Sequence, residues 1–369
     1  MMGGWASIWM PAYLPIRRYS MKTISKLQMA EDKPQEILLY WVRRHQTSLF
    51  FGLTFLFSWM IYLALSITSF ENETTYRRLL GVAAFGPSLS AILISRISNS
   101  KSWETGNTRR LSVSRRILIS LVIFLLVTGV EWWNNTWWDH AYDASLVLVD
   151  ALLVTFAVIV LLWSISNHDE PGSQMLGAKA ERAFLLWIIL ALIVWPALTL
   201  AGNTIASVLH IPLSTHPTWP DQPLIPILVQ SFIWAMLFGG PLNEEIGWRG
   251  FALPRLQLRF SPLVASLIIG TLWGLWHVPL HFMDTYGGGA FGAIIRLQEI
   301  PVAVIFTWLY NRSKGSLLVM LLLHASIKTT GWFLSRSYEI LFLLCTMLSI
   351  FLSIKDRMWE RLSEEGSTK

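Results

Sequence analysis

The chain has 369 residues, of which 53% are hydrophobic and only 14% are charged, and its formal net charge is +6. So much apolar surface exceeds what one water-soluble core would bury, which excludes a soluble enzyme and predicts an all-α, polytopic bundle of transmembrane helices. The basic residues are scattered through short loops between apolar runs, so no nucleic-acid-binding surface is expected.

The first 46 residues are expected to form a basic N-terminal tail in the cytoplasm. Pro11, Pro15 and Pro34 interrupt this segment, and it lacks an apolar run long enough for a signal peptide. Met21 offers an alternative start for the translated chain.

Long apolar runs then follow one another to the end of the chain. A spanning helix needs roughly 20 mainly apolar residues, and about eight to ten spans are expected on this basis. The ten candidates lie near residues 48–70, 79–97, 117–133, 144–165, 183–203, 224–242, 262–282, 290–310, 315–334 and 338–354. The single cysteine, Cys345, lies in the last of them, so neither an internal disulfide nor a cysteine-based metal site is expected.

The distribution of Lys and Arg predicts the orientation of these spans. With the N-terminus inside, the inside segments hold 23 of the 29 basic residues and the outside loops hold three. Positively charged loops stay on the cytoplasmic side, so both termini are predicted to be cytoplasmic. The compact loops and the lack of a transit peptide favour a bacterial plasma membrane.

The first group of ionisable residues within the apolar runs is GGPLNEEIGWRG, residues 239–250. Such side chains cost at least ~2.5 kcal/mol each in hydrocarbon, so they are candidates for function. The two glycines and the proline predict a break in the sixth span. Glu245 and Arg249 are four residues apart and can pair on one helix face, while Glu244 points about 100° away, toward a cavity. Taken alone, the group fits a salt bridge at the membrane edge equally well.

Three histidines lie in later spans. His277 and His281 are one turn apart in WGLWHVPLH, although Pro279 between them can kink the helix. His324 lies in LLLHASIK, with Lys328 one turn further on. A lone histidine in a helix is more often a packing residue than a catalyst. Carboxylates and histidines on three separate spans instead indicate one site in the core of a bundle.

Two chemical schemes fit Glu244, His277 and His324. In one, the three side chains hold a divalent metal such as zinc, which lowers the pKa of its bound water to about 7. In the other, Glu244 is a general base for a water oriented by His277, and His324 donates to the developing oxyanion. The sequence contains no HExxH motif, no Gly-x-Ser-x-Gly elbow and no Walker-type phosphate loop.

At these residues the chain resembles the CPBP, or ABI, family of intramembrane proteases, which groups CAAX prenyl proteases with bacteriocin-processing enzymes. That family carries a Glu-Glu-x-x-x-Arg motif, an aromatic-x-x-x-His motif and a His-x-x-x-Asn motif or a close variant. Their counterparts here are Glu244, Glu245 and Arg249, then Trp273 and His277, and then His324 with position 328.

The resemblance implies an endopeptidase that hydrolyses a membrane-associated or lipid-modified polypeptide. Its catalytic core would be residues 224–334, preceded by N-terminal transmembrane helices in residues 47–223 and followed by the last helix and a cytoplasmic tail in residues 335–369. It also implies that Glu244 and His277 activate the attacking water while His324 and the fourth position stabilise the oxyanion. Metallopeptidase and metal-free glutamate mechanisms are both associated with the family.

Two positions depart from the family pattern. Trp273 replaces the more usual Phe, which keeps an aromatic wall, and Lys328 stands where Asn is common. The ammonium of Lys328 can donate to an oxyanion, or it can pair with Glu244 or Glu245 and occupy the site. A non-catalytic membrane scaffold or immunity-type protein of the same family is therefore the alternative. A secondary transporter ranks last, because paired broken helices in two related halves are missing, and the sequence does not define the oligomeric state.

Overall fold

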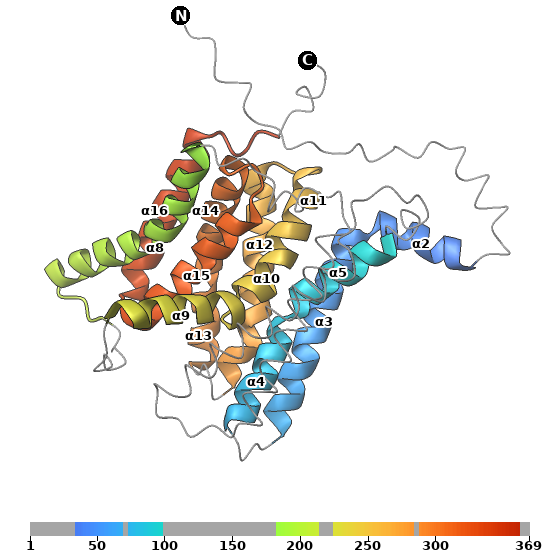
Figure 1. Ribbon diagram of the computed structural model, residues 1–369, viewed down its shortest axis with the longest axis horizontal. Coiled ribbons are helices and arrows are strands. Elements are labelled where there is room, and N and C mark those ends of the chain that lie inside the picture. Colours follow the sequence, from blue (N-terminus) through green and yellow to red (C-terminus); the bar gives the residue numbers. More distant parts are fainter. Residues whose placement is uncertain (1–33, 69–72, 99–181, 214–223, 284–287, 362–369) are drawn as a thin grey trace, which may run out of the picture.

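The computed structural model describes residues 34–68, 73–98, 182–213, 224–283 and 288–361. These residues form helices and no strand, which confirms the all-α class. Figure 1 shows α12, α14 and α15 in the middle of the bundle, α8 and α16 on one side, and α3 to α5 on the other. The spans predicted near 117–133 and 144–165 lie outside the described residues, as does the tail up to residue 33.

Five described segments are long and apolar enough to cross a membrane. They are Gln46–Ile67 (α3), Phe184–Val208 within α8 (Arg182–Val208), Pro262–Phe282, Gly289–Arg312 and Tyr338–Lys355 (α16). The third consists of α12 (Pro262–His277) and the 3-10 turn η4 (Val278–Phe282), and the fourth of α13 (Gly289–Ile295), η5 (Arg296–Gln298) and α14 (Glu299–Arg312). They confirm five of the predicted spans, and α15 (Leu317–Phe333) is a shorter apolar helix at the ninth.

The sixth predicted span is a broken helix. Leu224–Leu237, within α9 (Leu224–Phe238), and Pro241–Gln257 meet at a bend of 40°. The second part consists of α10 (Pro241–Gly247), the π-helical turn η3 (Trp248–Ala252) and α11 (Leu253–Gln257). Gly240 at the bend has φ of 120°, a conformation open to glycine and costly for other residues. The break predicted from Gly239, Gly240 and Pro241 is therefore confirmed.

The prediction of one continuous span near residues 79–97 was wrong. The chain forms two shorter helices here, α4 (Glu73–Ala84) and α5 (Gly86–Ser98), instead of one continuous span. Pro87 lacks the N–H that would continue the helix. The hydroxyl of Ser58 on α3 donates to the carbonyl oxygen of Ala83 at 2.7 Å, which gives the interrupted backbone a partner. In the part of the chain that the structure describes, α2 (Pro34–Arg44) precedes α3.

Serine residues define the starts of three helices around the core. The hydroxyls of Ser261, Ser316 and Ser337 each accept a hydrogen bond from the backbone N–H three residues later, at the N-termini of α12, α15 and α16. Such caps satisfy one of the backbone donors that a helix leaves unpaired at its N-terminus. The polar residues between apolar runs thus fix where these helices begin.

Two glycines allow α12 to pack closely against the start of α14. A methyl group on Gly270 would lie 2.6 Å from the Cα of Ile300, and one on Gly274 would lie 2.7 Å from the carbonyl oxygen of Arg296. Small residues four apart permit such close approach between membrane helices. The contact fixes α12, which carries Trp273 and His277, against the η5 and α14 segment.

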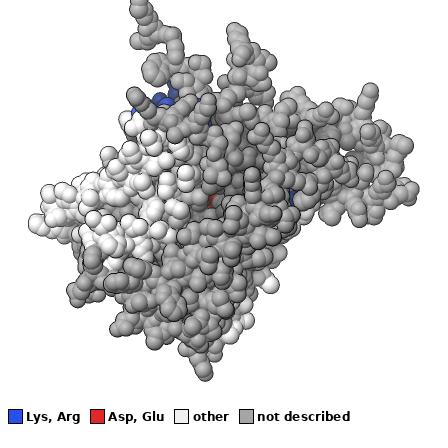
Figure 2. All heavy atoms as spheres, viewed as in Figure 1, with Lys and Arg blue, Asp and Glu red and all other residues white. Residues whose placement is uncertain are grey.

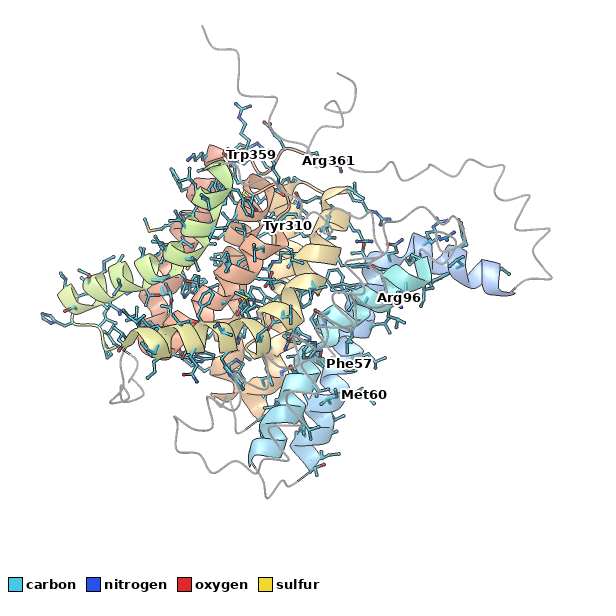
Figure 3. All side chains as sticks on the ribbon, viewed as in Figure 1. Phe57, Met60, Arg96, Tyr310, Trp359 and Arg361 are labelled. Atoms are coloured by element: carbon cyan, nitrogen blue, oxygen red, sulfur yellow. The ribbon has the colours of Figure 1, made fainter. Side chains whose placement is uncertain are left out.

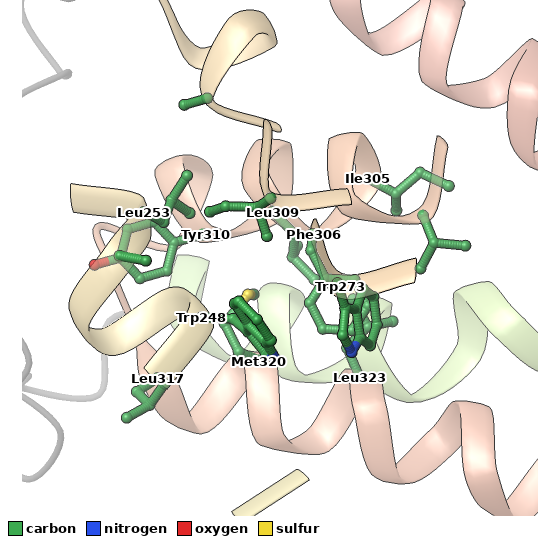
Figure 4. Close-up of a cluster of buried hydrophobic side chains, with 14 of the residues drawn as sticks. Trp248, Leu253, Trp273, Ile305, Phe306, Leu309, Tyr310, Leu317, Met320 and Leu323 are labelled. Carbon is green, nitrogen blue, oxygen red and sulfur yellow. The ribbon is translucent and has the colours of Figure 1, made fainter. Parts of the chain in front are cut away.

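The surface of the bundle and its interior differ sharply. Met60 projects from α3 (Figure 3) and is 61% exposed, and much of α8 also presents exposed leucines and isoleucines. The described surface visible in Figure 2 is almost entirely uncharged, as expected for helices in contact with lipid. Inside, Trp248, Phe306 and Met320 belong to a close-packed apolar cluster (Figure 4) beside the candidate site.

Candidate active site

The Glu-Glu-x-x-x-Arg segment lies immediately after the break in the sixth span. Glu244 and Glu245 are on α10, Arg249 is in η3, and all three are buried. Nη1 of Arg249 lies 3.0 Å from Oε1 of Glu245, so the predicted pairing across one turn is confirmed. Glu244 faces another direction, as the predicted rotation between neighbouring residues requires.

The helix widens at this segment. The N–H of Leu253 donates to the carbonyl oxygen of Trp248, five residues earlier, so one π-helical turn separates α10 from α11. Such turns occur mostly as single bulges in α-helices, and frequently at functional sites. Arg249 is within this turn, next to the paired Glu245.

Aromatic rings surround the guanidinium of Arg249. Its central carbon lies 4.5 Å from the ring centre of Trp273 and 4.1 Å from that of Phe306. Ring faces attract a desolvated cation, and the effect grows when water is excluded. Arg249 is thus held by one carboxylate and two rings, and this fixes Glu245 in turn.

Glu244 is held by the edge of the same Trp273 ring. Its Oε2 accepts a hydrogen bond from the indole N–H of Trp273 at 2.6 Å. A methyl group on Gly240 would lie 2.6 Å from Oε1 of Glu244, and 3.4 Å both from Nε2 of His324 and from Cε of Lys328. The three side chains therefore converge on the backbone of Gly240.

The two histidines are oriented through their Nδ1 atoms. Nδ1 of His277 lies 2.9 Å from the carbonyl oxygen of Trp273. A carbonyl oxygen only accepts, so this nitrogen carries the proton and leaves a lone pair on Nε2 in the neutral ring. Nδ1 of His324 lies 2.7 Å from Oε1 of Glu245, the same oxygen that pairs with Arg249. Both rings are buried.

His281 bonds to a neighbouring cluster of charged residues. Helix α12 ends at His277 and a 3-10 turn follows, so the two histidines do not share one α-helical face. Nε2 of His281 instead accepts from Nε of Arg296 at 2.8 Å, and Arg296 also pairs with Glu299 at 3.1 Å. This second cluster was not predicted from the sequence, although Arg296 and Glu299 are ionisable residues in a predicted span.

Lys328 is half-buried beside the site. Within the described part of the chain its ammonium has no hydrogen-bond or ion-pair partner, so the pairing with Glu244 or Glu245 that would occupy the site is not formed. Its charge acts on both Glu244 and His277. Cε of Lys328 and Oε1 of Glu244 both lie close to Gly240.

The residues that would hold zinc are not assembled as one ligand set. Among the described residues, no three His, Cys, Asp or Glu side chains are grouped closely enough to bind a single metal ion. The atoms that a metal would use are Oε1 of Glu244 and Nε2 of each histidine, because the other polar atoms of these side chains bond within the protein.

Two comparisons with known proteins match the part of the chain that contains this site. The family model described as type II CAAX prenyl endopeptidase Rce1-like matches residues 54–330, three quarters of the chain. The chain is also 31% identical over 221 residues to CAAX prenyl protease 2 of Methanococcus maripaludis. That match covers 54% of this chain and 78% of the archaeal protein. The matched range of the family model includes every residue of the candidate site.

Proposed function

Since this chain belongs to the Rce1-like family of type II CAAX prenyl endopeptidases, we propose that it hydrolyses a polypeptide at the membrane through a water activated by Glu244 and His277. The family establishes a membrane-embedded protease with a polypeptide substrate. One observation carries the assignment of residues: Glu244, His324 and Lys328 converge on Gly240, in a site whose other members are held by buried ionic bonds.

Water activation is assigned to Glu244 and His277. Oε2 of Glu244 is engaged by Trp273, which leaves Oε1 to accept a proton from water. Nε2 of His277 carries a lone pair in the neutral ring and orients the same water by accepting its second hydrogen. The water oxygen then bonds to the peptide carbonyl carbon. As the C–N bond breaks, Glu244 returns its proton to the leaving amine.

Stabilisation of the oxyanion is assigned to His324 and Lys328. The ammonium has three N–H donors and no partner among the residues that the structure describes. His324 is fixed by Glu245 with Nε2 toward Gly240, and the tautomer with its proton on Nε2 donates to the oxyanion there. Donors already in place for a developing charge are typically the largest single contribution to catalysis.

The substrate proposal follows from the names of the relatives and from the charge pattern. The family model is described as a CAAX prenyl endopeptidase and the archaeal relative as CAAX prenyl protease 2, so we assign a lipid-modified or membrane-associated polypeptide to this chain. The proposed orientation has both termini in the cytoplasm, with the plasma membrane as the location. The sixth span then runs inward, and Glu244 lies toward the cytoplasmic side.

The test is cleavage by the purified protein in detergent. Wild type is incubated with prenylated CAAX peptides and with a quenched peptide library, beside Glu244→Gln, His277→Ala and His324→Ala. Glu339→Gln changes an exposed carboxylate in the first turn of α16, which accepts a hydrogen bond from Ser337, and serves as control. Metal content is measured on the same samples, which decides between metal-dependent and glutamate chemistry.

The proposal requires cleavage by wild type and the control, and loss of cleavage in three variants that remain folded. Binding of the peptides with no cleavage by wild type would overturn it and favour a non-catalytic scaffold. The same conclusion would follow if Glu244→Gln cut as fast as wild type.

A further inference from the structure

We infer that Trp273 is a positioning residue that sets the geometry of the proposed base and of its histidine partner together. This inference rests on the proposed function of Glu244 and His277. It concerns the indole N–H and the backbone carbonyl of a single residue, which bond to the two groups assigned to activate water.

The two bonds come from the same turn of α12. The indole N–H of Trp273 donates to Oε2 of Glu244 at 2.6 Å, and its carbonyl oxygen accepts from Nδ1 of His277 at 2.9 Å. Any shift of this turn therefore moves both groups in the same direction. A hydrogen bond to a carboxylate is stronger than one between neutral groups, so the side-chain bond strongly restricts the Glu244 rotamer.

The bond also differentiates the two oxygens of Glu244. Oε2 is occupied by the indole, whereas Oε1 lies against the Gly240 backbone on the side of His324 and Lys328. Without the N–H the carboxylate can rotate, and either oxygen can then face the water. The indole thus selects the oxygen that accepts the proton, which matters because small errors in the placement of a base are costly in rate.

Packing holds the indole in its own place. Trp273 is 3% exposed, its ring lies edge-on to Phe306 with centroids 5.9 Å apart, and Arg249 lies over its face. Gly270 and Gly274 on the same helix bring its backbone against the η5 and α14 segment. The donor is therefore rigid before substrate binds, as a positioning group should be.

Other buried tryptophans supply a matched control. Trp195 on α8 is 6% exposed, and its indole N–H has no hydrogen-bond partner within the described residues. Trp195→Phe thus removes the same atoms from an equally buried ring without removing a bond. Trp273→Phe removes the bond but also leaves a smaller ring. Incorporation of β-(3-benzothienyl)alanine at position 273 replaces only the N–H by sulfur and keeps the ring shape.

The experiment measures kcat and KM of these proteins on the best peptide found for wild type, with the melting temperature as a check of folding. Loss of a hydrogen bond to a charged group predicts a fall in kcat of about 10- to 100-fold for both changes at position 273, with KM altered less than about twofold. Trp195→Phe is expected to keep wild-type kcat.

Two results would overturn the inference about Trp273 and leave the proposed function intact. One is a benzothienyl variant at position 273 with the kcat of wild type, and the other is a loss of activity that appears only as a raised KM. Failure of the proposed function gives a different result, because wild type itself would then cut none of the peptides. That result would overturn both the proposed function and the positioning role of Trp273.

Discussion

Nη1 of Arg249 lies 3.0 Å from Oε1 of Glu245 in a place where neither side chain reaches the surface. The same carboxylate oxygen also lies 2.7 Å from Nδ1 of His324. One buried carboxylate therefore connects the π-helical turn of the broken span to α15. Each partner of such an arrangement becomes a buried unpaired charge or donor when the other is removed.

Arg249→Met is expected to destabilise the protein by about 3–5 kcal/mol, because Glu245 would remain buried without its cation. The unfolding free energy in detergent measures this, with the exposed Arg361→Met as control. The Glu245→Met/Arg249→Met double variant should recover part of the loss, since no uncompensated charge remains. A loss below about 1 kcal/mol for Arg249→Met would contradict the structural role given to this pair.

Gly240→Ala is expected to abolish most cleavage. The added methyl group would lie 2.6 Å from Oε1 of Glu244, and the φ of 120° is unfavourable for alanine. We expect kcat to fall by at least about 100-fold, since a displacement of 1 Å costs that much. Gly52→Ala is the control, because a methyl group there would meet nothing within 4 Å. Wild-type kcat in Gly240→Ala would refute the convergence of the site on this residue.

Lys328→Met is expected to lower kcat by about 10²–10³, the usual effect of removing one oxyanion donor. Lys328→Asn keeps a donor and should retain more activity than Lys328→Met. Steady-state kinetics on both variants measures the difference. Equal activity in the two would show that the side chain at 328 does not donate in the transition state, and a gain in Lys328→Asn over wild type would show that the ammonium obstructs the site.

Gly270→Ala is expected to destabilise the protein by about 1–3 kcal/mol through overpacking. The methyl group would lie 2.6 Å from the Cα of Ile300 and 2.8 Å from the carbonyl oxygen of Glu299, and backbone atoms cannot move aside cheaply. Melting temperatures of this variant and of Gly52→Ala give the comparison. Equal melting temperatures would argue against the close approach of α12 and α14.

His281→Leu should reduce stability more than kcat, because His281 accepts from Arg296 outside the group around Glu244. Leucine leaves that bond of the guanidinium unmade, at a cost of about 1–3 kcal/mol. His281→Gln retains an acceptor and should restore most of the melting temperature. A selective loss of kcat in both variants, at normal stability, would instead place His281 among the catalytic residues.

Local spacing accounts for much of what could be predicted from the sequence. Glu245 and Arg249 pair because residues four apart share a helix face, and the span breaks at Gly239 and Gly240 because glycine and proline there disfavour a continuous helix. The lengths of the apolar runs likewise predicted the five spans that the described residues confirm.

Contacts between distant segments account for what the sequence did not reveal. The bond from Trp273 to Glu244 depends on how α12 is rotated against α10, and no spacing within either helix specifies that angle. The pair of Arg296 and Glu299 was not predicted, although ionisable residues inside a span are themselves a signal. The division into α4 and α5 depends on Ser58, which lies on another helix.

The extra residue in the π-helical turn at Trp248–Ala252 separates α10, which carries Glu244, from α11, which packs in the apolar core. An uninterrupted α-helix would lock the direction of Glu244 to that of Leu253, so a substitution that improved packing at one end would rotate the reactive end as well. With the wider turn between them, the two ends can accumulate changes independently. A single-residue deletion in this turn should therefore reduce activity and stability more than most substitutions within it. The deletion would restore continuous α-helical spacing and rotate Glu244 relative to Leu253.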